Sequence, residues 1–121
     1  MEKLTNREEE IMLILWRLKT AFVKELIEEL TDPKPHYNTV STMVRILEEK
    51  GFVGYKTFGK SHQYFPKVTQ DDYKQKYVGG IVDNYFGNSF KNMVTFFAKK
   101  ERLSKSDLQE ILHQIENDAD E

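Results

Sequence analysis

The 121-residue sequence contains no cysteine, only three prolines and a single tryptophan. The absence of cysteine excludes disulfides, thiolate nucleophiles and sulfur-based zinc or iron–sulfur sites, and it agrees with a reducing compartment. No apolar run is long enough to cross a bilayer, and the charged N-terminus does not resemble a signal peptide. We therefore expect a cytoplasmic protein with no membrane insertion.

Neither sign of charge is in large excess, because 18 basic and 20 acidic side chains give a net charge of −2. The charges are unevenly distributed, however. Residues 33–67 carry six basic and two acidic side chains, whereas residues 1–32 carry five and eight, and residues 68–121 carry seven and ten. A basic segment of this kind is either a solvated face or a contact surface for a polyanion.

Little in the sequence supports catalysis. The three histidines lie far apart, at positions 36, 62 and 113, and neither a glycine-rich phosphate loop nor a cluster with metal-ligand spacing is present. Asp71 and Asp72 are better explained as first-turn residues of a helix than as an acid–base pair. We expect no enzymatic activity, no cofactor and no metal site.

The spacing of the apolar residues predicts helices in the N-terminal part of the chain. Thr5 and Glu8 have the spacing of a capping box, which begins one helix, and apolar residues at helical spacing over residues 23–30 indicate a second. A third helix is expected after Pro35, with its end at Gly51, which can adopt the left-handed cap conformation.

The periodicity then changes to that of a hairpin. β-rich runs over residues 52–58 and 62–65 flank a short basic tip. Three helices followed by a hairpin is the order of a winged helix-turn-helix, and three further helical patterns follow Pro66. The expected fold is mainly α with a small β-hairpin, with residues 1–67 as a winged-helix DNA-binding domain and residues 68–121 as a three-helix dimerisation domain.

The C-terminal helices require a partner for their apolar faces. About fifty residues in three short helices bury too little surface to be stable alone. The N-terminal domain or a second copy of the chain must cover them, and we favour the second copy, because two-fold dimers are the commonest closed assemblies. The expected dimerisation residues are Tyr77, Ile81, Tyr85, Phe90, Val94, Phe97, Leu108, Ile111 and Ile115.

The third helix and the hairpin form a candidate DNA-binding surface. The helix is expected to bury one face and to expose small polar groups and one arginine on the other, a composition that suits the major groove. Lys34 is a further candidate contact, and His62 is either a phosphate contact or only a strand residue. The candidate residues are His36, Tyr37, Asn38, Thr39, Ser41, Thr42, Arg45, Lys56, Lys60 and His62.

A family resemblance adds to this interpretation. The run over residues 38–53, the upstream residues Glu9, Ile11, Met12 and Trp16, Tyr64 and the region 90–97 resemble the penicillinase-repressor family, the BlaI/MecI/CopY group. The resemblance implies a homodimeric winged-helix repressor of an inverted-repeat double-stranded DNA operator, inactivated by a signal and acting in resistance or stress regulation. It also implies recognition-helix contacts from Thr39, Thr42 and Arg45.

Three features depart from the family pattern. The family commonly has arginine directly before the leucine of its recognition helix, whereas this chain has Ile46 there and Arg45 one position earlier, a rotation of about 100° around a helix. Antibiotic-responsive members are cut at an Asn-Phe bond, and the matching bond here joins Phe96 to Phe97. This bond is the candidate cleavage site for a membrane sensor-protease pathway. The cysteine-rich tail of copper-responsive members is absent.

A winged helix does not by itself establish DNA binding. The alternative function is a protein-interaction module without operator specificity. The salt dependence of binding distinguishes the two functions, because the affinity for DNA falls steeply as salt weakens the phosphate contacts.

Overall fold

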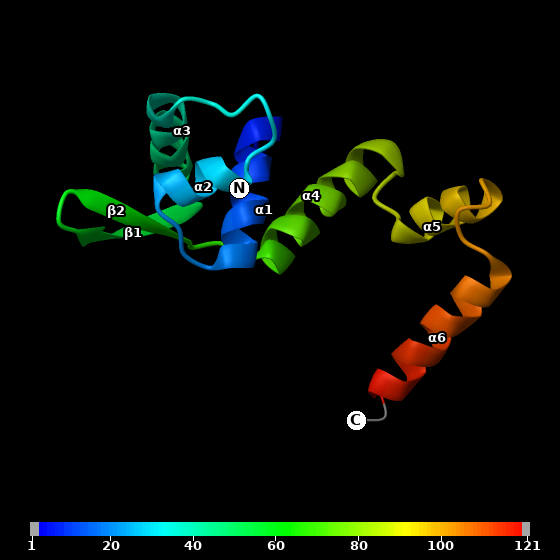
Figure 1. Cartoon of the computed structure of the whole chain (residues 1–121). Coiled ribbons are helices and arrows are strands. Elements are labelled where there is room, and N and C mark those ends of the chain that lie inside the picture. The colour runs from blue at the N-terminus through cyan, green and yellow to red at the C-terminus, as the bar shows by residue number, and fades with distance from the viewer. Residues whose placement is uncertain (1–2, 120–121) are drawn as a thin grey trace. The chain divides into compact units, whose positions relative to one another are not determined.

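The computed structural model describes residues 3–119 and divides the chain into two compact units. The N-terminal unit is Met1–Tyr77 and the C-terminal unit is Val78–Glu121. The described residues form six helices and one antiparallel hairpin (Figure 1), which confirms the predicted fold class. In chain order the elements are α1 (Asn6–Leu18), α2 (Val23–Glu29), α3 (Tyr37–Glu49), β1 (Val53–Phe58), β2 (Ser61–Pro66), α4 (Gln70–Tyr85), α5 (Phe90–Lys99) and α6 (Lys105–Ala119).

The predicted ends of α1 and α3 are confirmed. The Thr5 hydroxyl accepts a hydrogen bond from the Glu8 backbone N–H at 3.2 Å, and the Glu8 carboxylate accepts one from the Thr5 N–H at 2.9 Å. This reciprocal capping box satisfies two donors at the start of α1. The C-terminal end of α3 is followed by Gly51, whose φ of 84° is a conformation that glycine adopts without steric cost.

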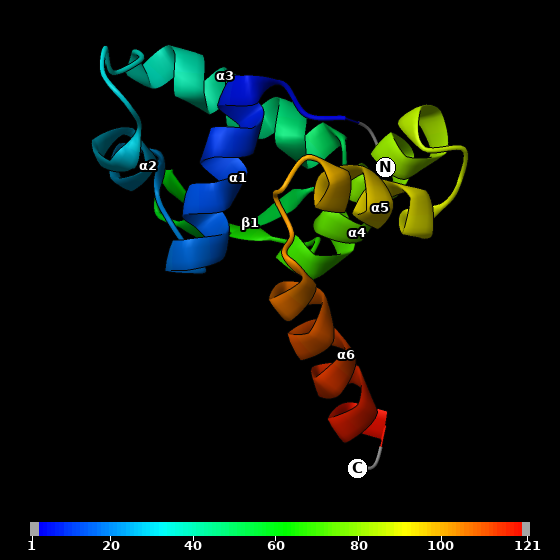
Figure 2. The ribbon, with the colours of Figure 1, turned by 90° about the vertical axis from the view of Figure 1, so that its right-hand side faces the viewer.

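The core of the N-terminal unit lies between α1, α2, α3 and the hairpin (Figure 2). The hairpin is joined to this body by an isolated bridge. The Ala21 N–H donates to the Tyr64 carbonyl at 2.9 Å, and the Tyr64 N–H donates to the Ala21 carbonyl at 2.8 Å. The segment between α1 and α2 therefore fixes the base of the hairpin, as expected for a wing.

The N-terminal unit continues past residue 67, the predicted domain boundary, into the first half of α4. The Trp16 indole N–H donates to the Val68 carbonyl at 2.8 Å. Tyr73 is buried, and its ring packs against Trp16 and Phe52 with centroid separations of 5.7 and 5.8 Å. These contacts hold the first half of α4 to the winged-helix core, so the compact unit ends at Tyr77.

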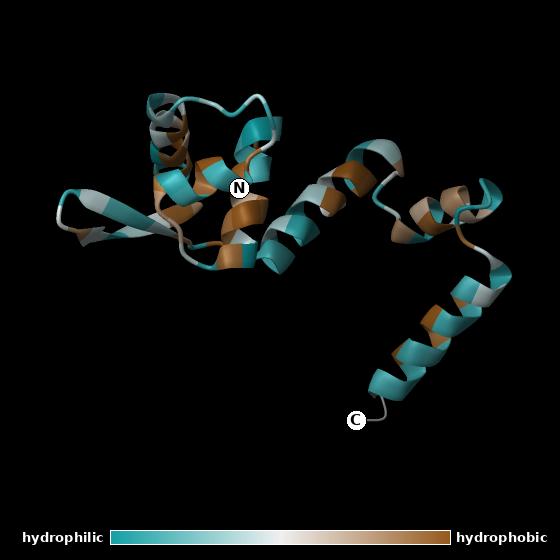
Figure 3. Cartoon of the chain, in the orientation of Figure 1, coloured by the Kyte–Doolittle hydropathy of each residue, from teal (hydrophilic) through white to brown (hydrophobic). Residues whose placement is uncertain are grey.

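The C-terminal unit has well-formed helix ends but almost no core. Gly87 and Asn88 end α4 with positive φ angles, and Ser104 and Asp107 form a reciprocal cap at the start of α6. Within residues 78–118, however, Val82 is the only buried side chain. Figure 3 shows apolar positions repeating along α5 and α6, and these side chains are mostly exposed.

Candidate nucleic-acid interface

The two faces of α3 differ as the sequence predicts. Val40, Val44 and Leu47 are fully buried in the core, because they repeat at helical spacing. The opposite face is exposed and carries Asn38, Thr39, Thr42 and Arg45, and Ser41 is half-buried beside it. The core therefore fixes the helix and directs its polar face outward.

The beginning of α3 carries no negative charge. His36 occupies the N-cap position without a side-chain capping bond, and the first turn contains no acidic residue. The free backbone N–H groups and the positive end of the helix dipole therefore face solvent, an arrangement that favours phosphate. Exposed His36, Tyr37 and Asn38 add side-chain hydrogen-bonding groups there.

Thr42 and Arg45 are available to a ligand in different ways. The Thr42 hydroxyl donates to the Asn38 carbonyl at 2.9 Å, so it offers an acceptor and a methyl group. The Arg45 guanidinium forms no salt bridge within residues 3–119. Arginine can form a bidentate contact with guanine, and a threonine methyl can contact thymine.

Lys34, named above as a further candidate contact, has a structural role in the chain. Its ammonium donates to the carbonyls of Ile27, Glu28 and Leu30 at 3.2, 2.8 and 2.9 Å. Lys34 therefore caps the C-terminal end of α2, where the helix leaves carbonyls without partners. A count of charges along the sequence does not reveal this role.

The hairpin exposes the three predicted contact residues Lys56, Lys60 and His62. Gly59, with a φ of 61°, and Lys60 form the turn between Phe58 and Ser61, which pair across the two strands. The His62 imidazole stacks on the Tyr55 ring with a centroid separation of 4.1 Å. The structure thus places all ten candidate residues in the N-terminal unit, on α3, its N-cap and the hairpin.

Tyr64 fixes the base of the hairpin through its backbone bonds to Ala21 and was not among the predicted site residues. It is buried, and burial raises the pKa of its phenol. The Glu48 carboxylate adds to this rise, while the Arg45 guanidinium opposes it. Tyr64 therefore lies in the electrostatic range of the exposed end of α3 while its backbone fixes the hairpin.

A buried ion pair anchors the C-terminal end of α3. The Lys50 ammonium lies 3.1 and 3.2 Å from the two carboxylate oxygens of Glu8, whose residue is only 4% exposed. Burial opposes ionisation of Glu8, but the hydrogen bonds from Thr5 and the ammonium of Lys50 outweigh it and lower the pKa of this carboxyl from 4.5. The pair joins the end of α3 to the first turn of α1.

This lowered pKa predicts a specific contribution to acid unfolding. Because the folded-state pKa of Glu8 is depressed, its stabilising effect is complete above the unfolded value and is lost as the pH falls through the folded value. The free energy of unfolding of wild type should therefore decrease more between pH 6 and strongly acidic pH than that of Glu8→Gln. Urea titrations followed by Trp16 fluorescence across this pH range measure the difference, and parallel pH profiles would contradict the expectation.

No group of three or more histidine, aspartate or glutamate residues in the described chain has the arrangement of a metal site. Among the helices over residues 3–119, none combines the length and hydropathy that a membrane span requires.

Comparison with known proteins supplies the family. The family model described as "Penicillinase repressor" matches residues 4–117, nearly the whole chain. The chain belongs to the penicillinase-repressor family. Among its relatives, the methicillin resistance regulatory protein MecI of Staphylococcus aureus (strain N315) is 30% identical over 110 residues, which are 90% of this chain and 89% of MecI. A penicillinase repressor of Staphylococcus aureus is 27% identical over 119 residues, covering 96% and 92% of the two chains.

A solved structure agrees with the fold of this repressor. The solution structure of the DNA-binding domain of the repressor BlaI aligns with a TM-score of 0.51 and 27% identity, covering 60% of this chain and 94% of that domain. The predicted family resemblance is confirmed, and the chain is a DNA-binding transcriptional repressor and not an enzyme.

Proposed function

We propose that the repressor binds an inverted-repeat operator as a homodimer, with α3 of each copy in a major groove and the hairpin beside it. The exposed polar face of α3, with its acid-free beginning and neighbouring basic hairpin, carries this proposal. An α-helix fits the major groove, and these side chains are able to hydrogen-bond base edges there. The proposed DNA contacts are His36, Tyr37, Asn38, Thr39, Ser41, Thr42, Arg45, Lys56, Lys60 and His62.

The exposed apolar surface of the C-terminal unit supports the dimer. Tyr85 is 78% exposed and Ile115 is 60% exposed, although both belong to apolar stripes. A second copy would cover these faces and place two recognition helices on one duplex at a spacing of about 34 Å or its multiples. The proposed interface residues are Tyr77, Ile81, Tyr85, Phe90, Val94, Phe97, Leu108, Ile111 and Ile115.

The named relatives suggest what the repressor controls. One is named for regulation of methicillin resistance and another for repression of penicillinase. By analogy, the operator lies beside resistance or stress-response genes in the cytoplasm, and a membrane sensor-protease pathway relieves repression. The proposed cleavage site, Phe96–Phe97, lies within α5, which buries none of its side chains, so local unfolding would expose it at low free-energy cost.

DNA selection tests the operator proposal. The purified repressor is mixed with fragments of its host genome, and bound fragments are sequenced. We expect an inverted repeat among them, with a binding constant whose log-log salt slope is about −0.9 per neutralised phosphate. Equal affinity for the selected repeat and a scrambled duplex would contradict sequence-specific repression.

Replacing Arg45 with alanine should weaken binding to the selected operator by about 1–3 kcal/mol per half-site if the guanidinium makes a bidentate base contact. The same change should relax preference at one base pair. Thermal unfolding should be unchanged, because Arg45 is exposed and forms no salt bridge within the described chain. A uniform loss on all DNA sequences would identify Arg45 as a phosphate contact instead.

A further inference from the structure

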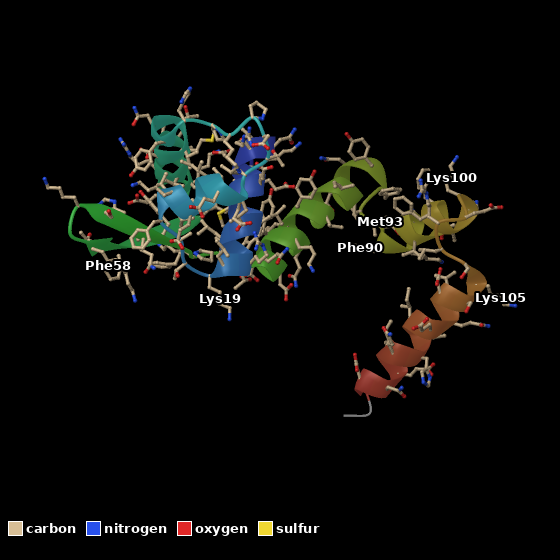
Figure 4. All side chains as sticks on the ribbon, in the orientation of Figure 1. Lys19, Phe58, Phe90, Met93, Lys100 and Lys105 are labelled. Atoms are coloured by element: carbon tan, nitrogen blue, oxygen red, sulfur yellow. The ribbon has the colours of Figure 1, made fainter. Side chains whose placement is uncertain are left out.

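An aromatic groove lies between the recognition helix and the tip of the hairpin. It is lined by Phe22, Val23, Lys24 and Glu25 at the start of α2, by Tyr37 at the start of α3, and by Phe58 and Ser61 of the hairpin. The rings of Phe22 and Phe58 meet edge to face with a centroid separation of 5.9 Å. Figure 4 labels Phe58 on the hairpin.

The exposure of these rings is not explained by the core. Phe58 is 53% exposed and Tyr37 is 52% exposed, although the N-terminal unit has an apolar interior that accommodates Phe52 completely. The groove also belongs to the N-terminal unit, so it is separate from the apolar faces assigned to the dimer. A cluster of exposed aromatic rings of this kind commonly marks a binding surface.

The position of the groove indicates which part of the operator DNA would contact it. In the proposed complex α3 enters the major groove, and the hairpin lies beside it at the adjoining minor groove. A major and a minor groove are separated by one sugar–phosphate strand. The aromatic groove lies between Tyr37 of α3 and Phe58 of the hairpin. In the proposed complex we therefore expect that strand to pass over it.

The polar lining indicates which part of the strand is bound. Lys24 and Glu25 contribute one charge of each sign, and the Glu25 carboxylate already accepts the Phe22 backbone N–H at 2.8 Å. The groove therefore has no net charge with which to attract phosphate. Exposed Lys56 and Lys60 supply positive charge on the same hairpin.

We infer that this groove binds a deoxyribose of the operator backbone, with the sugar against Phe58 and Tyr37 and the flanking phosphates on the hairpin lysines. The inference rests on the proposed function. An apolar wall suits the carbon face of deoxyribose, whereas a ribose 2′-hydroxyl turned against the Phe58 ring would lose its hydration without gaining a hydrogen-bond partner from that ring. The groove thus adds contact area common to all DNA sequences and favours DNA over RNA.

Substitution of Phe58 tests the contact. The probes are a duplex selected by wild-type repressor from a random-sequence library and a scrambled duplex. Phe58→Ala should weaken binding to both by about tenfold, from the loss of buried apolar area, and leave the salt slope unchanged. Lys60→Ala should instead reduce the magnitude of the slope by about 0.9 for each phosphate that the lysine neutralises in wild type. Leu13→Ala, a truncation at an exposed site of α1 outside the groove, is the matched control and should bind as wild type.

A ribonucleotide scan identifies the bound sugar. Single ribonucleotides are placed in turn along the selected duplex, and binding is measured for wild type and Phe58→Ala. We expect one or two positions per half-site at which the 2′-hydroxyl weakens the binding affinity of wild type about tenfold. At these positions the affinity of Phe58→Ala should fall much less, because the losses from two coupled groups are not additive. Wild-type affinity in Phe58→Ala, or equal ribonucleotide effects in both proteins, would overturn this inference alone. Failure of wild type to bind any duplex would overturn the proposed function as well.

Discussion

Replacing Ile111 and Ile115 with aspartate is expected to make the repressor monomeric and to weaken binding to an inverted repeat about 10²–10⁴-fold. Both side chains belong to the apolar stripe of α6, and they are 44% and 60% exposed in the single chain. In a two-fold dimer each substitution introduces a buried charge twice. Without the partner, the second half-site no longer benefits from the high effective concentration that the dimer provides.

Sedimentation velocity at micromolar concentration and binding to the selected operator measure the two effects. The matched control is His113→Asp with Asn117→Asp, which introduces two acidic side chains elsewhere on α6, where both residues are exposed and contact each other at 3.1 Å. The control should remain dimeric and bind normally. A monomeric wild type, or an Ile111/Ile115 variant that remains a dimer with full affinity, would refute the proposed interface.

Replacing Lys50 with methionine should lower the free energy of unfolding of the N-terminal unit by about 3 kcal/mol. Removal of one partner from a buried ion pair costs about 3–5 kcal/mol, because the remaining charge is left in a poorly solvated site. The Lys50 side chain is 20% exposed, so water that enters the vacated space moderates the cost. Urea unfolding followed by Trp16 fluorescence reports on this unit, in which the indole is half-buried.

The double variant Glu8→Gln with Lys50→Met is the control for this prediction. Glutamine keeps the hydrogen bond to the Thr5 backbone and is neutral, so it should recover most of the stability lost in Lys50→Met. Equal losses in the single and double variants would show that the lysine stabilises through the packing of its methylenes. Unchanged stability in both would refute a stabilising role for the pair.

Elements with local signals could be predicted from the sequence. The capping box at Thr5, the glycine cap after α3 and the buried stripe of α3 involve residues within a few positions of each other, where spacing alone fixes the geometry. The hairpin followed from β-rich runs around Gly59. The exposed polar face of α3 was predicted for the same reason, because burial of one face of a helix determines the other.

Contacts between distant residues could not be predicted in this way. Glu8 and Lys50 are 42 positions apart, and Trp16 and Val68 are 52 apart, so no periodicity connects them. The packing of Tyr73, beyond the predicted boundary at residue 67, in the winged-helix core is likewise not signalled by any local pattern. The bonds from Lys34 to three carbonyls could not be predicted either, because these acceptors come together only where α2 ends beside it.

The two hydrogen bonds between Ala21 and Tyr64 separate the hairpin into an anchored base and a free tip. Residues beyond the anchor, around Gly59 and Lys60, are thus open to insertions or to a fluorescent label without disturbing how the hairpin is attached. A change in the length or charge of this tip would accordingly alter how strongly the hairpin holds the DNA backbone without refolding the domain.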